Sequence, residues 1–303
     1  MKQEEVIACG GSPLEYFNEY LIIKGHAKST AAGMIKVIAR FKNWLTQENL
    51  AEETINHNDV MAYVNTLKKQ GIKQRTIQQY VGIIKTYYTF LQNEKKTITN
   101  NPVVSLKIQG VKRRELYDLF TEEELDQIHK NYQGETPIKR RNKVVLGLII
   151  YQGLKTEELA AIEPEDLKLR EGKIEIQGGR KSNPRKIELK SFQIIDLQDY
   201  IYVTRKEILS IRKTATKKLF MSLGESDRFN NLMFKLMKEL KKQNSRIKTV
   251  KQIRASVITN WLKIHPLRKA QYLSGHRYIN STEMYQVGNI EELKTAIEKY
   301  HPF

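Results

Sequence analysis

The chain has 303 residues, enough for one large domain or two of moderate size. Its 52 lysines and arginines outnumber 34 aspartates and glutamates, and the resulting net charge of +18 predicts nucleic acid as the partner. No apolar run approaches the roughly 20 residues that span a bilayer, the first residues lack a secretory apolar stretch, and the single cysteine, Cys9, excludes a disulfide framework or a thiolate metal cluster. We therefore expect a cytoplasmic protein that associates with the nucleoid and needs no membrane, metal or other cofactor.

Residues 14 to about 94 carry apolar side chains at helical spacing, which predicts four helices. Asn58 and Gly71 are the expected capping positions of the third helix. Lys73 and Arg75 stand at the start of the fourth, a place where DNA phosphates are often contacted, although a plain solvated turn fits equally well. We predict an all-helical DNA-binding domain over residues 12–94.

Between residues 95 and 115 the helical pattern fails, and Pro102 and Gly110 interrupt the chain. Basic residues accumulate here, among them Lys112 and Arg113. Such a run is often only solvated and flexible, but its position between two basic domains favours DNA contact. We predict a basic linker over residues 95–115.

The second predicted domain covers residues 116–303. Thr121 and Glu124 have the spacing of a helical capping box, and helices are expected over 141–152, ending at Gly153, and from about Thr156. Residues 173–176 and 186–189 alternate polar with apolar around a glycine-rich basic segment, which predicts a β-hairpin with a basic tip. Helices follow at about 191–209, 228–241, 250–264, after Pro266, near Tyr285 and at 290–300. The expected fold class is mainly α with a small β-sheet.

Polar groups suited to phosphate chemistry gather near the end of the chain. Lys251 and Arg254 share a predicted helix, and His276 and Tyr285 follow. The segment KQIRASVITNWLK resembles the HxLRHxxAT block of tyrosine recombinases. The segment YLSGHRYINSTEMY resembles their LGHxxxxxTxxYxH block. Upstream, YQGLKTEELAAIEPEDL resembles their GLRxxELxxLxxxDI block, and the helical first domain resembles their core-binding domain. The resemblance covers nearly the whole chain and implies a two-domain DNA clamp.

This resemblance implies a site-specific recombinase that cuts and rejoins DNA through a Holliday junction, in integration, excision, inversion or resolution. Tyr285 would be the nucleophile, forming a 3′-phosphotyrosine and releasing a 5′-hydroxyl. Arg254 and His276 would contact the nonbridging phosphate oxygens. Lys181 on the hairpin tip, or alternatively Arg180, would protonate the leaving 5′-oxygen.

Two positions depart from the family pattern. Lys251 stands where the second block usually has histidine, and Lys155 stands where the first block has arginine. Lysine keeps the charge but lacks the planar fork that holds two oxygens, which could cost about 3 kcal/mol, roughly a hundredfold in rate. Slowed catalysis, compensation by a neighbouring arginine and a degenerate enzyme are all compatible with Lys155. The alternative function is a weak or inactive DNA-binding member that acts as an accessory or regulator, and a third is a type IB topoisomerase-like relaxing enzyme.

The resemblance also implies a partner and an assembly. Double-stranded DNA carrying specific recombination sites would be bridged by a homotetramer. Residues 289–303 have apolar side chains at helical spacing and could pack on their own domain or dock into a neighbouring subunit. The sequence leaves both arrangements open.

Overall fold

The structure is a computed structural model that describes residues 12–110, 118–179, 182–212, 214–224 and 229–286. The chain divides into two compact units, Met1–Arg114 and Glu115–Phe303. Four predicted DNA-contacting or catalytic residues, Lys112, Arg113, Arg180 and Lys181, lie outside the described residues, as does the segment 289–303.

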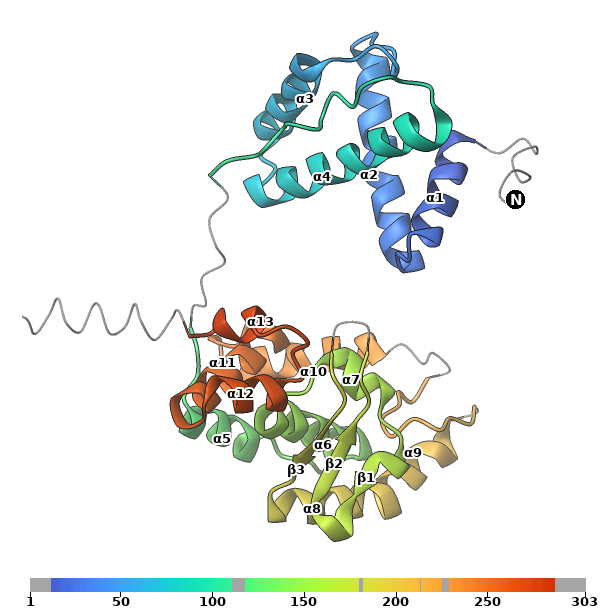
Figure 1. Cartoon of the computed structure of the whole chain (residues 1–303). Helices are drawn as coiled ribbons and strands as arrows, with labels where there is room; N and C mark the ends of the chain where they lie inside the picture. Colours follow the sequence, from blue (N-terminus) through green and yellow to red (C-terminus); the bar gives the residue numbers. More distant parts are fainter. Residues whose placement is uncertain (1–11, 111–117, 180–181, 213, 225–228, 287–303) are drawn as a thin grey trace, which may run out of the picture. The chain divides into compact units, whose positions relative to one another are not determined.

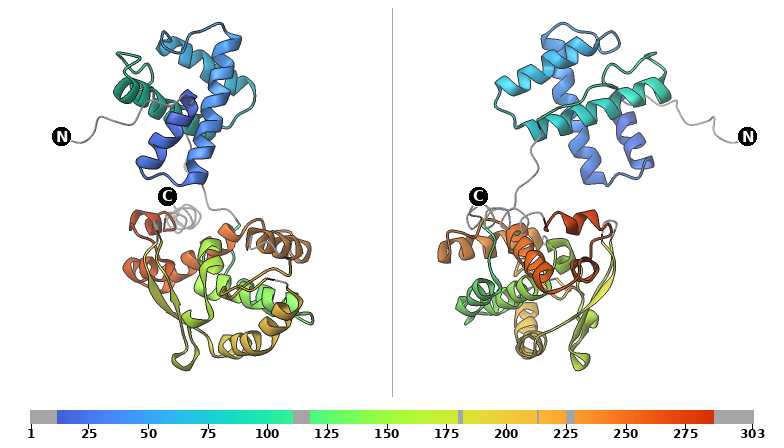
Figure 2. Two further views of the ribbon diagram at one scale, coloured as in Figure 1. Left: turned by 90° about the vertical axis from the view of Figure 1, so that its right-hand side faces the viewer. Right: turned by 60° about the vertical axis from the view of Figure 1, so that its left-hand side comes forward.

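The N-terminal unit is helical, as predicted (Figure 1). Its helices are α1 (Pro13–Ile23), α2 (Lys28–Gln47), α3 (His57–Lys69) and α4 (Gln74–Phe90), and α4 continues into the π-helical turn η1 (Leu91–Lys95). α4 crosses α2 and contacts it, as Figure 1 and the right-hand view of Figure 2 show. Edge-to-face aromatic pairs fill the core, with Phe17 on Tyr87 and Phe41 on Tyr63 each at a ring-centroid distance of 4.9 Å.

The start of α3 corrects one prediction. Asn56, and not Asn58, is the N-cap: its side chain accepts from the backbone N–H groups of Asn58 at 2.7 Å and Asp59 at 3.4 Å. Asp59 completes the capping box by accepting from the N–H of Asn56. The N–H of Asn58 is thus one of the unpaired donors that a cap satisfies. Gly71 follows the C-cap at a φ of +74°, as expected for the residue that ends a helix.

Part of the segment predicted as linker packs on the N-terminal unit. Val103 is fully buried in that core, and Ile98, Leu106 and Ile108 pack against it. Asn101 ties the segment to α4, because its amide donates to the carbonyl of Lys85 at 3.1 Å. The packed N-terminal unit therefore extends beyond Lys95, since apolar side chains can be buried without helical periodicity.

The C-terminal unit combines helices with one small sheet, which confirms the predicted fold class (Figure 1). Its first part comprises α5 (Glu122–Asn131), α6 (Pro137–Gln152), α7 (Thr156–Ala161), η2 (Pro164–Asp166), β1 (Leu167–Lys168), η3 (Leu169–Glu171), β2 (Lys173–Ile176) and β3 (Arg185–Glu188). Its second part comprises α8 (Ser191–Asp199), the π-helical turn η4 (Tyr200–Thr204), α9 (Arg205–Ile211), α10 (Phe229–Gln243), α11 (Val250–Ile264), α12 (Leu267–Ser274) and α13 (Asn280–Glu283).

The sheet is antiparallel with the order β1-β2-β3, and Ile174 on β2 faces Ile187 on β3. The predicted hairpin is confirmed. β1 was not predicted, because two residues are too few to show an alternating pattern. Among the described residues, no helix is long and apolar enough to cross a membrane.

α6 is the central helix of this unit and packs against α5, α8, α9 and α11. It begins at Pro137, four residues before the predicted start, because Thr136 caps it and proline is accepted in a first helical turn. It ends at Gly153, as predicted, in the left-handed conformation with a φ of +57°. The predicted capping box of α5 is confirmed, with Thr121 and Glu124 exchanging hydrogen bonds of 3.0 and 3.2 Å.

Candidate active site

Arg254 lies on α11 and is buried. Its Nη1 donates to the carbonyl of Gly153, at the end of α6, and its Nη2 donates to the carbonyl of Ser274, at the end of α12, at 2.5 Å. Carbonyls at helix C-termini lack helical partners and carry partial negative charge, so a cation there is favourable. Burial lowers the pKa of Arg254 to about 10, and the guanidinium stays charged at neutral pH.

His276 follows Gly275, which ends α12 with a φ of +63°. Its Nε2 lies 3.4 Å from Nη2 of Arg254, and its Nδ1 lies 3.0 Å from Oγ1 of Thr282 and 3.2 Å from Oγ of Ser274. Burial first, and then the charge of Arg254, lowers the pKa of His276 to about 3. The imidazole is therefore neutral at physiological pH.

Tyr285 lies in the turn after α13, where its N–H donates to the carbonyl of Thr282 at 2.9 Å. Its ring stacks on that of His276, with a centroid distance of 5.9 Å and an interplanar angle of 15°. The side chain is only partly buried. The tyrosine thus stands beside the buried Arg254 and His276 with part of its surface open to solvent.

Lys155 is the N-cap residue of α7 and is half-buried. Its Nζ lies 4.0 Å from Oε1 of Glu158. Burial lowers the pKa of the Lys155 ammonium, the carboxylate of Glu158 opposes this shift, and Arg254 adds to it.

Two further residues join this cluster: Glu158, the glutamate of the GLRxxELxxLxxxDI block, and Arg185, which lies outside the quoted blocks. Arg185 on β3 has a fully buried side chain. Its two terminal nitrogens donate to the two carboxylate oxygens of Glu158 on α7, at 2.9 Å each. Its Nε donates to the carbonyl of Leu273 at 2.9 Å. A signal was available in the sequence: Arg185 occupies an inward position of the alternating strand, in line with Ile187, where an apolar side chain is the rule.

The structure does not bring every predicted residue into the cluster. Lys155, Arg254, His276 and Tyr285 meet there, whereas Lys251 is exposed on α11, one turn before Arg254. Lys73, the N-cap of α4, and Arg75 are exposed and belong to the N-terminal unit. Among the described residues, no group of three or more histidine, cysteine or acidic side chains could hold a metal ion.

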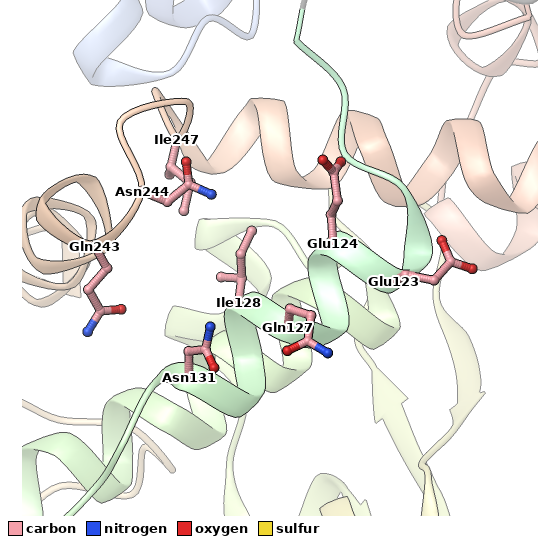
Figure 3. Close-up of a pocket in the computed structure, with 8 residues that line it drawn as sticks. All are labelled: Glu123, Glu124, Gln127, Ile128, Asn131, Gln243, Asn244 and Ile247. Carbon is pink, nitrogen blue, oxygen red and sulfur yellow. The ribbon is translucent and has the colours of Figure 1, made fainter.

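A hollow of about 330 Å³ lies elsewhere on this unit, between α5 and the end of α10 (Figure 3). Its lining includes Glu123, Glu124, Gln127 and Asn131, and none of the clustered cations. The carboxylates of Glu123 and Glu124 would repel a phosphate. The hollow is therefore no candidate for the phosphate site.

The order and geometry of these residues agree with comparisons to known proteins. Residues 118–292 match the phage integrase family, and residues 14–95 match the phage integrase N-terminal SAM-like domain. The chain belongs to the phage integrase family. As a member it is a tyrosine-type site-specific recombinase, and the motifs around Lys155, Arg254 and Tyr285 lie within the matched residues.

Two relatives match over nearly their whole lengths. The tyrosine recombinase XerD of Oceanobacillus iheyensis is 26% identical over 294 residues, which cover 95% of this chain and 97% of the relative. The tyrosine recombinase XerC of Bacillus licheniformis is 26% identical over 295 residues, which cover 95% of this chain and 96% of the relative.

Solved structures of similar recombinases share the fold. The XerH site-specific recombinase bound to a palindromic difH substrate superposes with a TM-score of 0.73 at 17% identity, covering 95% of this chain and 84% of that one. The Tn1549 transposon integrase in complex with transposon right end DNA gives a TM-score of 0.69 at 16% identity, covering 96% of this chain and 99% of that one.

Proposed function

We propose that this recombinase cleaves and rejoins double-stranded DNA at specific sites, with Tyr285 as the nucleophile. The observation that carries the proposal is the stacking of Tyr285 on His276, whose Nε2 lies 3.4 Å from the Arg254 guanidinium. The tyrosine hydroxyl loses its proton to solvent as its oxygen bonds to phosphorus, the bond to the 5′-oxygen breaks, and a 3′-phosphotyrosine remains. Because the energy of the phosphodiester is kept in this linkage, the 5′-hydroxyl of a partner strand can reverse the step without ATP.

Three described residues would contact the phosphate, two as cations and one as a neutral hydrogen-bond donor. Arg254 offers a guanidinium held at two helix ends, and Lys155 offers an ammonium at the start of α7. The hydroxyl of Thr282 can donate to Nδ1 of His276, and this tautomer leaves a proton on Nε2 for a phosphate oxygen. Lys251, exposed one turn before Arg254, is placed to contact DNA from the edge of the site.

The leaving 5′-oxygen needs a proton, and we assign this role to Lys181, with Arg180 as the alternative. Ser182, the next residue in the chain, pairs with His276, and the N–H of Asn183 donates to the carbonyl of Gly275 at 3.2 Å. This pairing joins Ser182 and Asn183, the residues that follow Lys181 in the sequence, to the His276 turn.

Binding would use both domains, 12–94 and 116–303, with the linker 95–115 between them. Lys73 and Arg75 of the first domain, and Lys112 and Arg113 of the linker, would contact backbone phosphates. We further propose a homotetramer on paired sites, with the segment 289–303 as a candidate link between subunits, acting on DNA in the cytoplasm. The net charge of +18 and the DNA-bound structural relatives support the DNA contacts.

The decisive experiment is covalent trapping on nicked suicide duplexes that carry candidate sites. The wild type should form an adduct that resists denaturant, and Tyr285→Phe should form none because it lacks the nucleophilic oxygen. Tyr278→Phe is the matched control, since Tyr278 is a tyrosine of the same segment and is 67% exposed. Adduct formation by Tyr285→Phe would refute the proposal.

The alternative function is an accessory DNA-binding protein without strand cleavage, and the lysine at position 155 favours it. Specific binding without an adduct, both in the wild type and in Lys155→Arg, would establish this alternative. An adduct only in Lys155→Arg would show that the lysine alone silences an otherwise complete site.

A further inference from the structure

The cluster contains three cations, and the proposed phosphate contacts involve two of them, Lys155 and Arg254. Lys155, Arg185 and Arg254 carry positive charge, and Glu158 is the carboxylate among them. Glu158 is buried, with only 5% of its side chain exposed. A buried carboxylate is stable only when it is paired with a cation. The cation that pairs with Glu158 is therefore unavailable to a phosphate.

Arg185 forms the close ion pair with Glu158. Its two terminal nitrogens each lie 2.9 Å from one carboxylate oxygen, which is the bidentate geometry of a strong charge-assisted pair. Burial would raise the pKa of Glu158, but the hydrogen bonds and charge of Arg185 hold it below its ordinary value. Glu158 therefore stays ionised, and its negative charge is matched by Arg185.

The same carboxylate lies within reach of a second cation. Nζ of Lys155 is 4.0 Å from Oε1 of Glu158, and the charge of Glu158 also acts on Arg254. If Arg185 were absent, the unpaired carboxylate would draw in the Lys155 ammonium, because leaving it alone in a buried site costs several kcal/mol. The lysine would then be less available to a phosphate.

Arg185 also holds the turn that presents His276. Its Nε donates to the carbonyl of Leu273, and its guanidinium fills the space beside Gly275, where a Cβ would lie 2.2 Å from Nη1. Tyr272 extends this contact, since its hydroxyl bonds with both the N–H and the carbonyl of Lys186 at 3.1 Å. Strand β3 and the end of α12 are thus joined along several residues.

We propose that Arg185 is a positioning residue for the recombination reaction. Its guanidinium pairs with the Glu158 carboxylate, so that the Lys155 ammonium remains available to the scissile phosphate. It also anchors the turn that carries His276. This inference rests on the proposed function. Arg185 itself need not touch DNA, because both of its terminal nitrogens are engaged by Glu158.

The test compares Arg185→Met, Glu158→Gln and the double variant in the full-length protein. Single-turnover cleavage of the suicide duplex should fall about a hundredfold in Arg185→Met. The double variant should recover at least tenfold of this loss, because the neutral amide no longer competes for Lys155. Lys186→Met, which removes an exposed pair with Glu175 on the same strands, is the matched control and should stay within twofold of the wild type.

A second readout needs no cleavage and separates sequestration of Lys155 from loss of structure. The rate at which acetic anhydride acetylates Lys155, followed by mass spectrometry at pH 8, should drop about fivefold or more in Arg185→Met and return in the double variant. Local unfolding would raise this rate instead. If Arg185→Met does not fold, Arg185→Lys, which cannot hold both oxygens and the Leu273 carbonyl, should show the same pattern more weakly.

The outcomes are distinct. An unchanged or faster acetylation of Lys155 in the Arg185 variants, or a double variant as slow in cleavage as Arg185→Met, would overturn the positioning role. A wild type that forms no adduct would instead overturn the proposed function, while the acetylation rates would still decide whether Arg185 keeps Glu158 away from Lys155.

Discussion

The rings of His276 and Tyr285 lie nearly parallel, 15° apart, with their centroids separated by 5.9 Å. Thr282, three residues before the tyrosine, contacts the same imidazole at Nδ1. The imidazole of His276 therefore packs on one side against Tyr285 and contacts, at its edge, Thr282 of α13, the helix before this tyrosine. The position of Tyr285 depends on a neutral, buried imidazole at the end of α12.

This dependence predicts acid sensitivity. The folded-state pKa of His276 is about 3, against 6.5 for an ordinary histidine, so only the unfolded chain takes up the proton as pH falls below 6.5. Stability present above pH 6.5 should be lost progressively toward pH 3, by about 2 kcal/mol at pH 5. In His276→Asn the fall in unfolding free energy between pH 7.5 and 5.0 should be smaller by about this amount.

The measurement is urea unfolding followed by Trp261 fluorescence in a Trp44→Phe background, which reports on the C-terminal unit alone. His129, whose pKa is also lowered by burial, contributes equally to both proteins. Equal acid sensitivity of wild type and His276→Asn would show that His276 does not stay neutral when folded.

Lys155→Arg should raise the rate of strand cleavage by about tenfold to a hundredfold, because a guanidinium fork holds two phosphate oxygens where an ammonium holds one. The pH profile should change as well. Burial lowers the pKa of Lys155, so the wild-type rate should fall on the alkaline side as this cation is lost, while the arginine variant should show no such fall. Single-turnover cleavage between pH 7 and 9, below the pKa of about 10 of Arg254, measures both, and identical profiles would remove Lys155 from the phosphate site.

Gly275→Ala should destabilise the C-terminal unit by more than a positive φ alone explains. The added Cβ would lie 2.2 Å from Nη1 and 2.6 Å from Cζ of Arg185, in addition to the strain of a φ of +63°. Gly172→Ala is the matched control: it has the same φ, and its Cβ would meet Ile194 at an ordinary 3.5 Å. We expect a cost of about 1 kcal/mol at Gly172 and at least about 2 kcal/mol more at Gly275, measured by Trp261 unfolding. Equal losses of unfolding free energy in the two variants would mean that the Arg185 side chain moves aside without destabilising the unit.

Ser256→Ala should destabilise the same unit by about 1 to 3 kcal/mol, because the buried N–H of Phe120 loses the hydroxyl that accepts it at 2.9 Å. Thr259→Val, on the same helix, removes a buried hydroxyl with no partner among the described residues and should be neutral or slightly stabilising. Comparable losses in both variants would show that the hydrogen bond to Phe120 does not set the cost.

The sequence by itself determined the fold class and much of the site. Helical periodicity, the Thr121 capping box, Gly153 and the alternating strands are local signals, and local signals can be read from neighbouring residues. The spacing of Arg254, His276 and Tyr285 carried the family resemblance, and the structure brings these three side chains together.

Only the tertiary structure decided how the charges are shared. Arg185 and Glu158 are 27 residues apart in the chain, and nothing local shows that they meet in a buried pair. The same holds for Lys155 and Lys251, two lysines at motif positions, of which one is half-buried in the cluster and the other exposed. Burial and pairing depend on which surfaces pack together, and these properties decide which cations a phosphate can use.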